Sequence, residues 1–498
     1  PAVREAETRR LTSDPSPLSF RIAAGAFLVL YAALLACANS DVAGGSDSSG
    51  YLNAARLLAR GRFSEKIEVL ARLELPSSDR EIFIPLGWTP AVEPGSMAPR
   101  YPPGLPLHMA AAAIAGGWTL APFLIGPIAA LTALALVYGI GRELGLSRGI
   151  AAAGVALLAA CPIFFGMAVQ PMADVPATAW VCAAIFFALR ARRQASWAFA
   201  AGAAFGIGVL VRPTDVLAVF AVALALPATR RVAGRFLLGA APFAAFLLLY
   251  DTAAFGRPTQ TGYGPMLAWT MSFSNLLPEI RHYGYWIPAL LTPLVPLAWL
   301  ALPFERRIPW KDRGLLLAWF GAFFAFYAFY EPYEDWWSVR FLLPGIPAMI
   351  LAALLLARDA GLPARPRRER VAVGLALVAA AITLDVIHIR RFDLLSMKSG
   401  ETVYREASRW ADGQIPAESL ILSMQMSGAL KYYTARPIAR WDALRPVTFP
   451  RIRQAARERG FRWYALLRAF EEGDFARDVP GNWTRVGTFR DVGLWRLD

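Results

Sequence analysis

Long apolar runs recur along this 498-residue chain from Phe20 to His388. Several of them exceed the roughly 18 apolar residues that an α-helix needs to cross a bilayer. No soluble core could bury them all, because the chain is 56% hydrophobic and only 18% charged. We therefore predict a mostly α, polytopic membrane protein. The predicted spans cover residues 20–38, 120–140, 150–169, 175–189, 197–211, 213–226, 236–254, 285–302, 315–330, 341–357 and 371–387.

Positive charge sets the predicted orientation of these spans. The net charge is +14, and arginines gather in alternate links between the apolar runs. Such links face the cytoplasm in membrane proteins. The alternation predicts about eleven spans, provided that the short apolar run 105–115 does not cross. No basic helix with interleaved aromatic residues is present, which argues against nucleic-acid binding.

Two regions are predicted on the outer side of the membrane. One is a polar loop, residues 39–103, within a membrane domain of residues 1–390. The other is residues 391–498, whose mixed charged and aromatic composition is typical of a soluble α/β domain. We expect this C-terminal domain to fold by itself and to contribute recognition or assembly contacts. Its predicted strands are 419–423, 463–467, 484–489 and 494–497, with a charged helix at 451–459.

Most familiar catalytic signatures are absent from the sequence. There is no P-loop, no GxGxxG followed by an acidic residue, and no HExxH. The three histidines, His108, His282 and His388, lie far apart, so we expect no histidine-rich metal site. The sequence leaves open whether a divalent cation takes part.

Two carboxylates lie at the outer edges of predicted spans. A charge next to hydrocarbon is costly, so such residues are functional candidates. Asp47 follows the first span and precedes a predicted helix at 51–60, and Asp174 opens a later span. Each could cap the N-terminus of its helix or act in catalysis. The sequence alone leaves both interpretations open.

Three arginines, Arg100, Arg212 and Arg340, also lie at the outer edges of spans. Guanidinium groups can hold a lipid phosphate by paired hydrogen bonds. Each arginine could instead be an anchor that reaches from a span to the interface. Trp336 lies in the aromatic run before Arg340 and could likewise belong to an interfacial aromatic belt.

Six short segments follow the order that a known family has. They are Asp47–Ala55, Tyr101–Gly104, Asp174–Pro176, Arg212–Pro213, Phe255–Tyr263 and Arg340–Pro344. With these segments the chain resembles the GT-C superfamily of membrane glycosyltransferases. The resemblance is to its bacterial family 39 branch, related to protein O-mannosyltransferases and lipid A aminoarabinose transferases, and it covers about residues 20–357.

The resemblance implies an inverting transfer of a sugar from a polyprenyl-phosphate donor to an acceptor hydroxyl or amine. The acceptor would be a lipid, a glycan or a protein. The reaction would take place at the outer face of the bacterial inner membrane. Asp47 is implied as the general base, and one base suffices for a single displacement. Many relatives have Asp-Glu here, whereas Ser48 follows Asp47. The second acid is therefore missing, supplied by Asp174, or replaced by Glu334 or Asp335.

Substrate-binding roles are implied for a further set of residues. These are Tyr51, Arg100, Tyr101, Arg212, Tyr263, Trp336 and Arg340. Arginines can stabilise the charge on a leaving phosphate without a metal. Two alternatives stay open: a non-catalytic GT-C-like membrane subunit, and a transporter for lipid-linked sugars. Transporters usually have related halves and broken helices, and the sequence shows neither.

Overall fold

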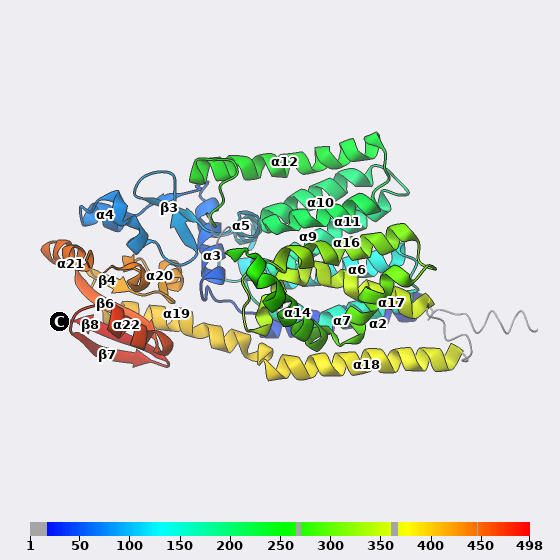
Figure 1. The fold of residues 1–498 in the computed structure, drawn as a ribbon. Coiled ribbons are helices and arrows are strands. Elements are labelled where there is room, and N and C mark those ends of the chain that lie inside the picture. The colour runs from blue at the N-terminus through cyan, green and yellow to red at the C-terminus, as the bar shows by residue number, and fades with distance from the viewer. Residues whose placement is uncertain (1–16, 265–269, 360–366, 446) are drawn as a thin grey trace, which may run out of the picture.

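The structure is a computed structural model that describes residues 17–264, 270–359, 367–445 and 447–498. Its apolar helices lie side by side at one end of the molecule, and two small sheets lie at the other end (Figure 1). Elements labelled η are 3-10 helices. The helices of the membrane part are α2 (Pro17–Ala38), α5 (Gly104–Gly116), η2 (Ala121–Leu124), α6 (Ile125–Glu143), α7 (Arg148–Ala160), α8 (Pro162–Ala168), α9 (Asp174–Arg190), α10 (Trp197–Val211), η3 (Pro213–Ala218), α11 (Val219–Ala225), α12 (Arg230–Phe255), η4 (Phe273–Asn275), α14 (Leu276–Leu291), α15 (Leu294–Ala301), η5 (Leu302–Phe304), α16 (Trp310–Tyr327), η6 (Trp336–Gly345), α17 (Ile346–Asp359) and α18 (Arg367–Arg391).

Each of the eleven predicted spans coincides with a helix or a bent pair of helices. Within the described residues, five helices are long and apolar enough to cross a membrane, and two bent pairs raise the number to seven if each pair is one span. The spans formed by α9, α10, η3 with α11, and α16 do not pass that test of length and composition. The mostly α membrane fold is confirmed, and the number eleven stays a prediction.

Prolines explain both bends. The α7–α8 pair bends by 65° where Pro162 opens α8, and the pair of segments around α14 and α15 bends by 114° at Thr292-Pro293. Proline has no N–H to donate to the preceding turn, so a helix ends or kinks at it. The two predicted spans 150–169 and 285–302 are therefore broken rather than straight.

The first loop forms a small sheet with short helices around it. Its elements are α3 (Asp47–Leu58), β1 (Glu65–Lys66), α4 (Glu68–Arg72), η1 (Ser77–Phe83), β2 (Trp88–Pro90) and β3 (Ser96–Pro99). The strand order is β1-β3-β2, and both pairings are antiparallel. The predicted helix at 51–60 is real, but it begins earlier, at Asp47 itself.

The C-terminal region has the predicted α/β composition. Its sheet has the order β5-β4-β6-β8-β7, in which β4 is parallel to β5 and β6 while β8 is antiparallel to β6 and β7. The predicted closing hairpin turns at Arg490-Asp491, where Arg490 has a φ of 53°. The elements are η7 (Leu394–Ser396), α19 (Met397–Gln414), β4 (Ser419–Leu422), α20 (Ser427–Tyr433), β5 (Ile438–Ala439), η8 (Trp441–Ala443), α21 (Phe449–Glu458), β6 (Arg462–Arg468), η9 (Ala469–Glu471), α22 (Glu472–Asp478), β7 (Trp483–Phe489) and β8 (Val492–Leu497).

The first loop and the C-terminal region share one hydrophobic core. Loop residues such as Phe83 and Trp88 are buried in the same cluster as Phe449 and Trp463 of the C-terminal region. The two parts lie side by side in Figure 1, far apart in colour but adjacent in space. The predicted boundary near residue 391 stays a prediction. The expectation that residues 391–498 form a self-contained fold does not account for this shared packing.

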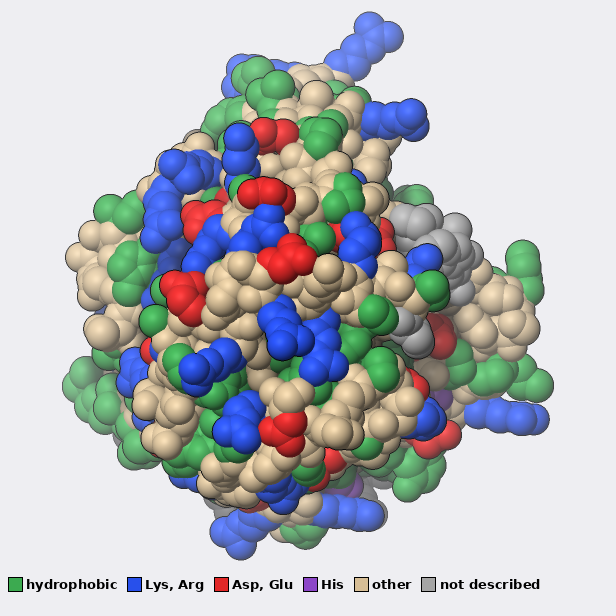
Figure 2. All heavy atoms as spheres, turned by 90° about the vertical axis from the view of Figure 1, so that its left-hand side faces the viewer, with side chains coloured by type: hydrophobic (Ala, Val, Ile, Leu, Met, Phe, Trp, Pro, Cys, Tyr) green, Lys and Arg blue, Asp and Glu red, His purple; other side chains and the backbone are tan. Residues whose placement is uncertain are grey.

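Ion pairs also join the loop to the C-terminal region. Arg451 contacts Asp79 at 2.7 Å, and Arg72 contacts Glu418 at 2.6 Å. Seen from this end, basic and acidic side chains are interspersed over the surface rather than gathered by sign (Figure 2). Such a mixed surface gives no support to nucleic-acid binding, which would require a continuous basic face.

Candidate functional site

Glycine sets up the turn that carries Asp47. Gly45 has a φ of +51°, in the left-handed region that glycine adopts without strain, and α3 begins two residues later. Gly50, one turn into α3, lies against Gly87, because a Cβ atom on Gly87 would be 2.5 Å from the Cα of Gly50. This close approach places the strand-rich part of the loop next to the start of α3.

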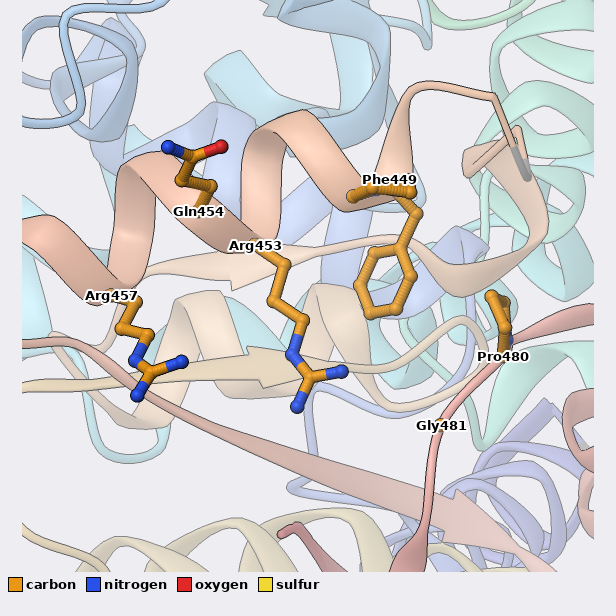
Figure 3. A pocket seen from close by; sticks show the side chains of 7 residues that line it. Phe449, Arg453, Gln454, Arg457, Pro480 and Gly481 are labelled. Carbon is orange, nitrogen blue, oxygen red and sulfur yellow. The ribbon is translucent and has the colours of Figure 1, made fainter.

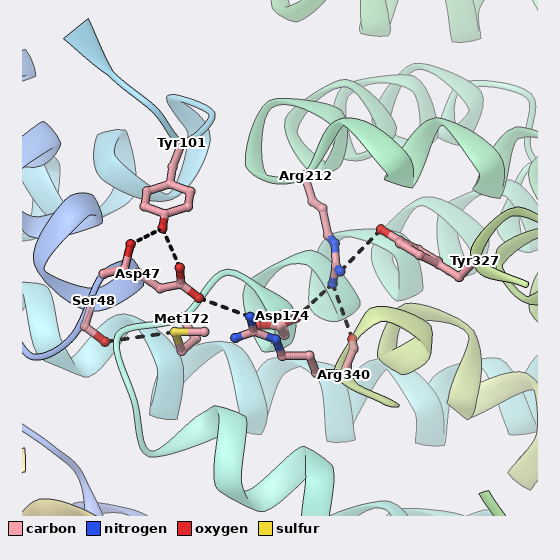
Figure 4. A network of polar contacts seen from close by, with 9 residues as sticks. Asp47, Ser48, Tyr101, Met172, Asp174, Arg212, Tyr327 and Arg340 are labelled. Carbon is pink, nitrogen blue, oxygen red and sulfur yellow. Dashed lines mark hydrogen bonds and ion pairs between the residues drawn. The ribbon is translucent and has the colours of Figure 1, made fainter. Parts of the chain in front are cut away.

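Asp47 does not cap its helix. Ser46 is at the cap position, and no side chain accepts a capping hydrogen bond there. The Asp47 carboxylate instead accepts a hydrogen bond from the Tyr101 hydroxyl at 2.5 Å, and Arg340 lies 3.1 Å from its other oxygen (Figure 4). The Ser46 hydroxyl is 2.9 Å from the Tyr101 hydroxyl. Two distant parts of the chain, at Tyr101 and Arg340, therefore hold the Asp47 carboxylate.

Arg340 reaches Asp47 from η6, the irregular helix that precedes α17. Its guanidinium lies over Trp337 at 5.0 Å and over Phe341 at 5.4 Å. Its side chain is only 17% exposed, and its Nε is buried with no hydrogen-bond partner among the described residues. A buried donor without a partner is costly, so this nitrogen has a vacant hydrogen bond for an anion to take up.

Asp174 and Arg212 form a second, more buried pair. Neither the Asp174 side chain nor any other caps α9, and the Asp174 carboxylate accepts from Arg212 Nη1 at 2.9 Å. Arg212 also donates to the Arg340 carbonyl at 3.3 Å and to the Tyr327 hydroxyl at 3.4 Å. Tyr327 in turn donates to Thr214 at 3.0 Å. Arg212 is thus engaged mainly with protein groups.

Three tyrosines lie together beside Asp47. The ring of Tyr101 lies 4.7 Å from that of Tyr51 and 6.2 Å from that of Tyr263. Burial, with a contribution from the Asp47 charge, raises the pKa of Tyr101 well above its usual value. Tyr101 therefore stays protonated at physiological pH and remains a donor to Asp47. The predicted residues Tyr51, Tyr101 and Tyr263 lie together.

Arg100 and Trp336 are placed differently from this group. The backbone of Arg100 lies against Gly262, where a Cβ atom would be 2.8 Å from the Arg100 Cα, so the loop with Tyr263 is held close to Tyr101. Trp336 stacks on Phe392 at 4.5 Å, and within the described parts of the chain no hydrogen bond, ion pair or ring contact joins it to Asp47, Tyr101 or Arg340. Its neighbour Trp337, which was not singled out from the sequence, is the tryptophan that contacts Arg340.

The structure separates the candidates for a second acid. Ser48, which replaces the second acid of many relatives, is buried and directs its hydroxyl toward Met172 Sδ at 3.9 Å. Glu334 and Asp335 are exposed, and Asp335 accepts from Trp337 at 3.2 Å. Asp174 is the one of these carboxylates that joins the network of Figure 4, through Arg212 and the Arg340 backbone.

No group of three or more His, Cys, Asp or Glu side chains with metal-binding geometry occurs in the parts of the chain that the structure describes. A cavity of about 310 Å³ lies beside α21, lined by Phe449, Pro450, Arg453, Gln454, Arg457, Pro480 and Gly481 (Figure 3). None of the predicted site residues lines it. The convergence of two carboxylates and two guanidinium groups places the candidate site at the Asp47 network instead.

Comparisons with known proteins agree on the architecture. Residues 102–251 match the family described as dolichyl-phosphate-mannose-protein mannosyltransferase. No curated protein sequence gives a significant match. The chain is similar in structure to ArnT from Cupriavidus metallidurans bound to undecaprenyl phosphate, with a TM-score of 0.57 and 15% sequence identity over 97% of this chain and 98% of that one.

Two further solved structures are similar. The Archaeoglobus fulgidus oligosaccharyltransferase in its apo form has a TM-score of 0.52 and 14% identity, covering 89% of this chain and 69% of that one. The arabinofuranosyltransferase AftD from Mycobacteria has a TM-score of 0.54 and 13% identity, covering 95% of this chain and 40% of that one. In each case the likeness includes both the helical part and much of the rest of the chain.

Proposed function

Since this chain has the fold of the GT-C superfamily of membrane glycosyltransferases, we propose that it transfers a sugar from a polyprenyl-phosphate donor to an acceptor hydroxyl or amine. The observation that carries the proposal is the Asp47 carboxylate, held by Tyr101 and Arg340 beside the membrane helices. Two similar proteins were solved with a lipid phosphate: ArnT with undecaprenyl phosphate and the archaeal oligosaccharyltransferase with dolichol-phosphate.

Asp47 acts as the general base in this proposal. It takes the proton of the acceptor group as the acceptor atom forms a bond to the anomeric carbon. The bond between that carbon and the phosphate oxygen breaks, and the lipid phosphate leaves with the bonding electron pair. A single displacement of this kind inverts the configuration at the anomeric carbon and requires one base.

Arg340 binds the phosphate of the donor. A guanidinium has five N–H donors in a planar fork, so Arg340 can keep Nη2 on Asp47 while Nε, on the same side of the guanidinium, donates to a phosphate oxygen. The vacant hydrogen bond at Nε supports this role. The low exposure of the site strengthens the attraction between guanidinium and the developing phosphate charge.

Asp174 and Arg212 have a supporting role. Their buried ion pair fixes the Arg340 backbone, because Arg212 donates to the Arg340 carbonyl at 3.3 Å. We therefore assign no proton transfer to Asp174. This assignment replaces the second acid of the family pattern with a residue that positions Arg340.

The setting follows from the predicted topology. In this proposal Asp47, Arg340 and the C-terminal region lie on the outer side of a bacterial inner membrane, and the alternating arginine links support that orientation. The acceptor is a lipid, a glycan or a protein on that side. The Arg340 guanidinium can stabilise the leaving phosphate without a bound metal.

Binding and transfer can be tested separately. Purified protein in detergent is titrated with undecaprenyl phosphate, and the rise in melting temperature gives the affinity. We expect binding by the wild type and by Asp47→Asn. Absence of any stabilisation in the wild type would contradict the proposal. Glu93→Gln, in the same loop but 53% exposed, is the control for removing a carboxylate.

Transfer is measured in proteoliposomes with radiolabelled undecaprenyl-phosphate pentoses and hexoses and a bacterial envelope extract as acceptor. Asp47→Asn should lose a factor of roughly 100 to 10,000 in rate, the usual contribution of a general base. A variant with more than half of the wild-type rate would exclude Asp47 as the base. Binding of undecaprenyl phosphate with no transfer of any sugar would favour the non-catalytic subunit.

A further inference from the structure

The helix that carries Asp47 is covered by the C-terminal region. Polar residues on its first turns, Ser48, Ser49 and Asn53, are all buried. Buried polar groups need hydrogen-bond partners. The partner of Asn53 is the Gly428 carbonyl, which accepts from Asn53 Nδ2 at 2.9 Å. Gly428 lies in α20, the short helix of the C-terminal region that packs against α3.

Gly428 allows α20 and α3 to touch. A Cβ atom at Gly428 would overlap the Ser49 hydroxyl and lie 3.0 Å from the Ser49 Cβ and 3.2 Å from the Leu86 carbonyl. Ser427, the preceding residue, accepts from the Leu86 N–H at 3.0 Å. The two helices therefore meet at a contact that has no room for a single methyl group.

The segment before Asp47 is held by the same C-terminal region. The Ala43 N–H donates to the Tyr433 hydroxyl at 2.8 Å, and Arg405 lies 3.2 Å from Asp41. The Glu401 carboxylate lies directly against Gly44, because a Cβ atom there would overlap it. Asp47 is thus preceded and followed by contacts with the C-terminal region.

A neighbouring side of α3 is closely packed as well. Gly50 is packed against the Tyr101 ring, since a Cβ atom at Gly50 would be 2.5 Å from Tyr101 Cε2. A displacement of α3 would therefore change its packing against Tyr101, the donor to Asp47. The position of the carboxylate depends on both contacts together.

We propose that the C-terminal region is a positioning element for Asp47, acting through the contact of Gly428 with Ser49. The inference rests on the proposed function, in which Asp47 is the base. A misplacement of about 1 Å at a reacting group can lower a rate by about 100-fold. The C-terminal region therefore governs the rate of transfer in addition to any contact that it makes with the acceptor.

The test adds a methyl group at Gly428, where it would overlap the Ser49 hydroxyl. Gly428→Ala should displace α3 and lower kcat by roughly 10- to 100-fold, with little change in the affinity for undecaprenyl phosphate. Gly413→Ala and Gly473→Ala are the matched controls, because a Cβ atom at either position meets nothing within 4 Å. Both controls should keep the wild-type kcat.

A second substitution removes the steric overlap with Ser49. Ser49→Gly removes both the hydroxyl and the Cβ that the new methyl group would meet. Gly428→Ala combined with Ser49→Gly should therefore regain most of the kcat that Gly428→Ala loses. A loss of kcat with no regain in the double variant would mean a general effect on folding and would overturn the proposal.

Hydrogen–deuterium exchange tests whether the contact of Gly428 with Ser49 positions α3, and it requires no assay of activity. In Gly428→Ala, peptides from α3 should exchange faster than in the wild type, while those from β6 should not change. Exchange in α3 equal to that of Gly413→Ala would refute the contact as a positioning device. If no sugar is transferred by the wild type, the proposed function fails, and this measurement still reports on α3.

Discussion

Arg340 Nη2 lies 3.1 Å from Asp47 Oδ2, which joins the first loop of the chain to the segment that precedes α17. The pair is partly shielded from water, with 17% of the arginine side chain and 29% of the aspartate side chain exposed. One guanidinium therefore touches the proposed base and, through its unpaired Nε, has a donor left for a phosphate. The two substrates of a transfer reaction would meet at this pair.

Removal of the Arg340 charge should weaken donor binding. Loss of one partner of a buried charged contact costs about 2–5 kcal/mol, so Arg340→Gln should raise the Kd for undecaprenyl phosphate by roughly 30-fold or more. Arg340→Lys should regain only part of this, since an ammonium cannot form the paired hydrogen bonds of a guanidinium. Arg257→Gln, an exposed arginine, is the control. Equal affinities for all three variants would exclude Arg340 as the phosphate ligand.

Loss of the Tyr101 hydroxyl should slow transfer. Tyr101→Phe keeps the ring but removes the hydrogen bond to the Asp47 carboxylate, and a hydrogen bond to a charged group contributes about 1.5–3 kcal/mol. The rate of transfer should therefore fall by roughly 10- to 150-fold. Tyr285→Phe, at an exposed tyrosine, should keep the wild-type rate.

The Asp174–Arg212 pair should behave as a structural unit. Arg212→Gln leaves the 7%-exposed Asp174 carboxylate without its charged partner, and breaking a buried pair in this way costs about 3–5 kcal/mol of stability. Asp174→Asn combined with Arg212→Gln removes both charges and should recover much of that loss. Thermal melting of the two single variants and the double variant gives the coupling. Additive losses would show that the two side chains act independently.

Hydropathy and charge predicted the membrane helices because both are local properties of the sequence. The same holds for Asp47, Tyr101 and Arg340, which stand in short recognisable segments. The sequence does not tell whether Trp336 or Trp337 contacts Arg340. Adjacent residues in a 3-10 helix point in different directions, and no periodic pattern shows which one faces the arginine.

The joint core of the loop and the C-terminal region could not be predicted in this way. Each half shows an ordinary alternation of polar and apolar residues, which is equally consistent with a self-contained domain. The association appears in the structure, where Trp88 and the distant Trp463 belong to one hydrophobic cluster. The interpretation of Asp174 as a helix cap failed for a related reason, since its partner Arg212 lies at the end of the next helix.

Glu401 should make stability depend on pH. Burial raises the pKa of Glu401, with Arg468 acting in the opposite direction. The folded state therefore binds the proton more tightly than the unfolded state, in which the pKa of the carboxyl is about 4.3. The stabilisation that this proton gives is complete below the unfolded-state pKa, and it is lost as the pH rises through the folded-state pKa. The Glu401→Gln variant has no carboxyl group at this position, so it does not lose stability in this way as the pH rises. Its melting temperature relative to the wild type should rise between about pH 4 and pH 7. A constant difference would contradict the burial of the charge.

The C-terminal region should not fold well without the first loop. Expressed alone, residues 392–498 would expose the apolar side chains of Phe449 and Trp463 that the loop covers. We expect no cooperative thermal transition for this fragment. A soluble fusion of residues 41–100 to residues 392–498 through a flexible linker should melt cooperatively. A cooperative transition of the fragment alone, at the temperature of the fusion, would contradict the shared core.

The shared core also has a consequence for the order of events during synthesis. The loop is made early, whereas β4 and β6, which complete its core, follow more than 300 residues later. At about 5–20 residues per second, that interval lasts roughly 15 seconds to a minute. For that time the apolar side chains of the nascent loop lack their final cover. Maturation of the site around Asp47 is therefore tied to completion of the chain, and a truncated product would be left with an exposed apolar surface that chaperones and proteases can recognise.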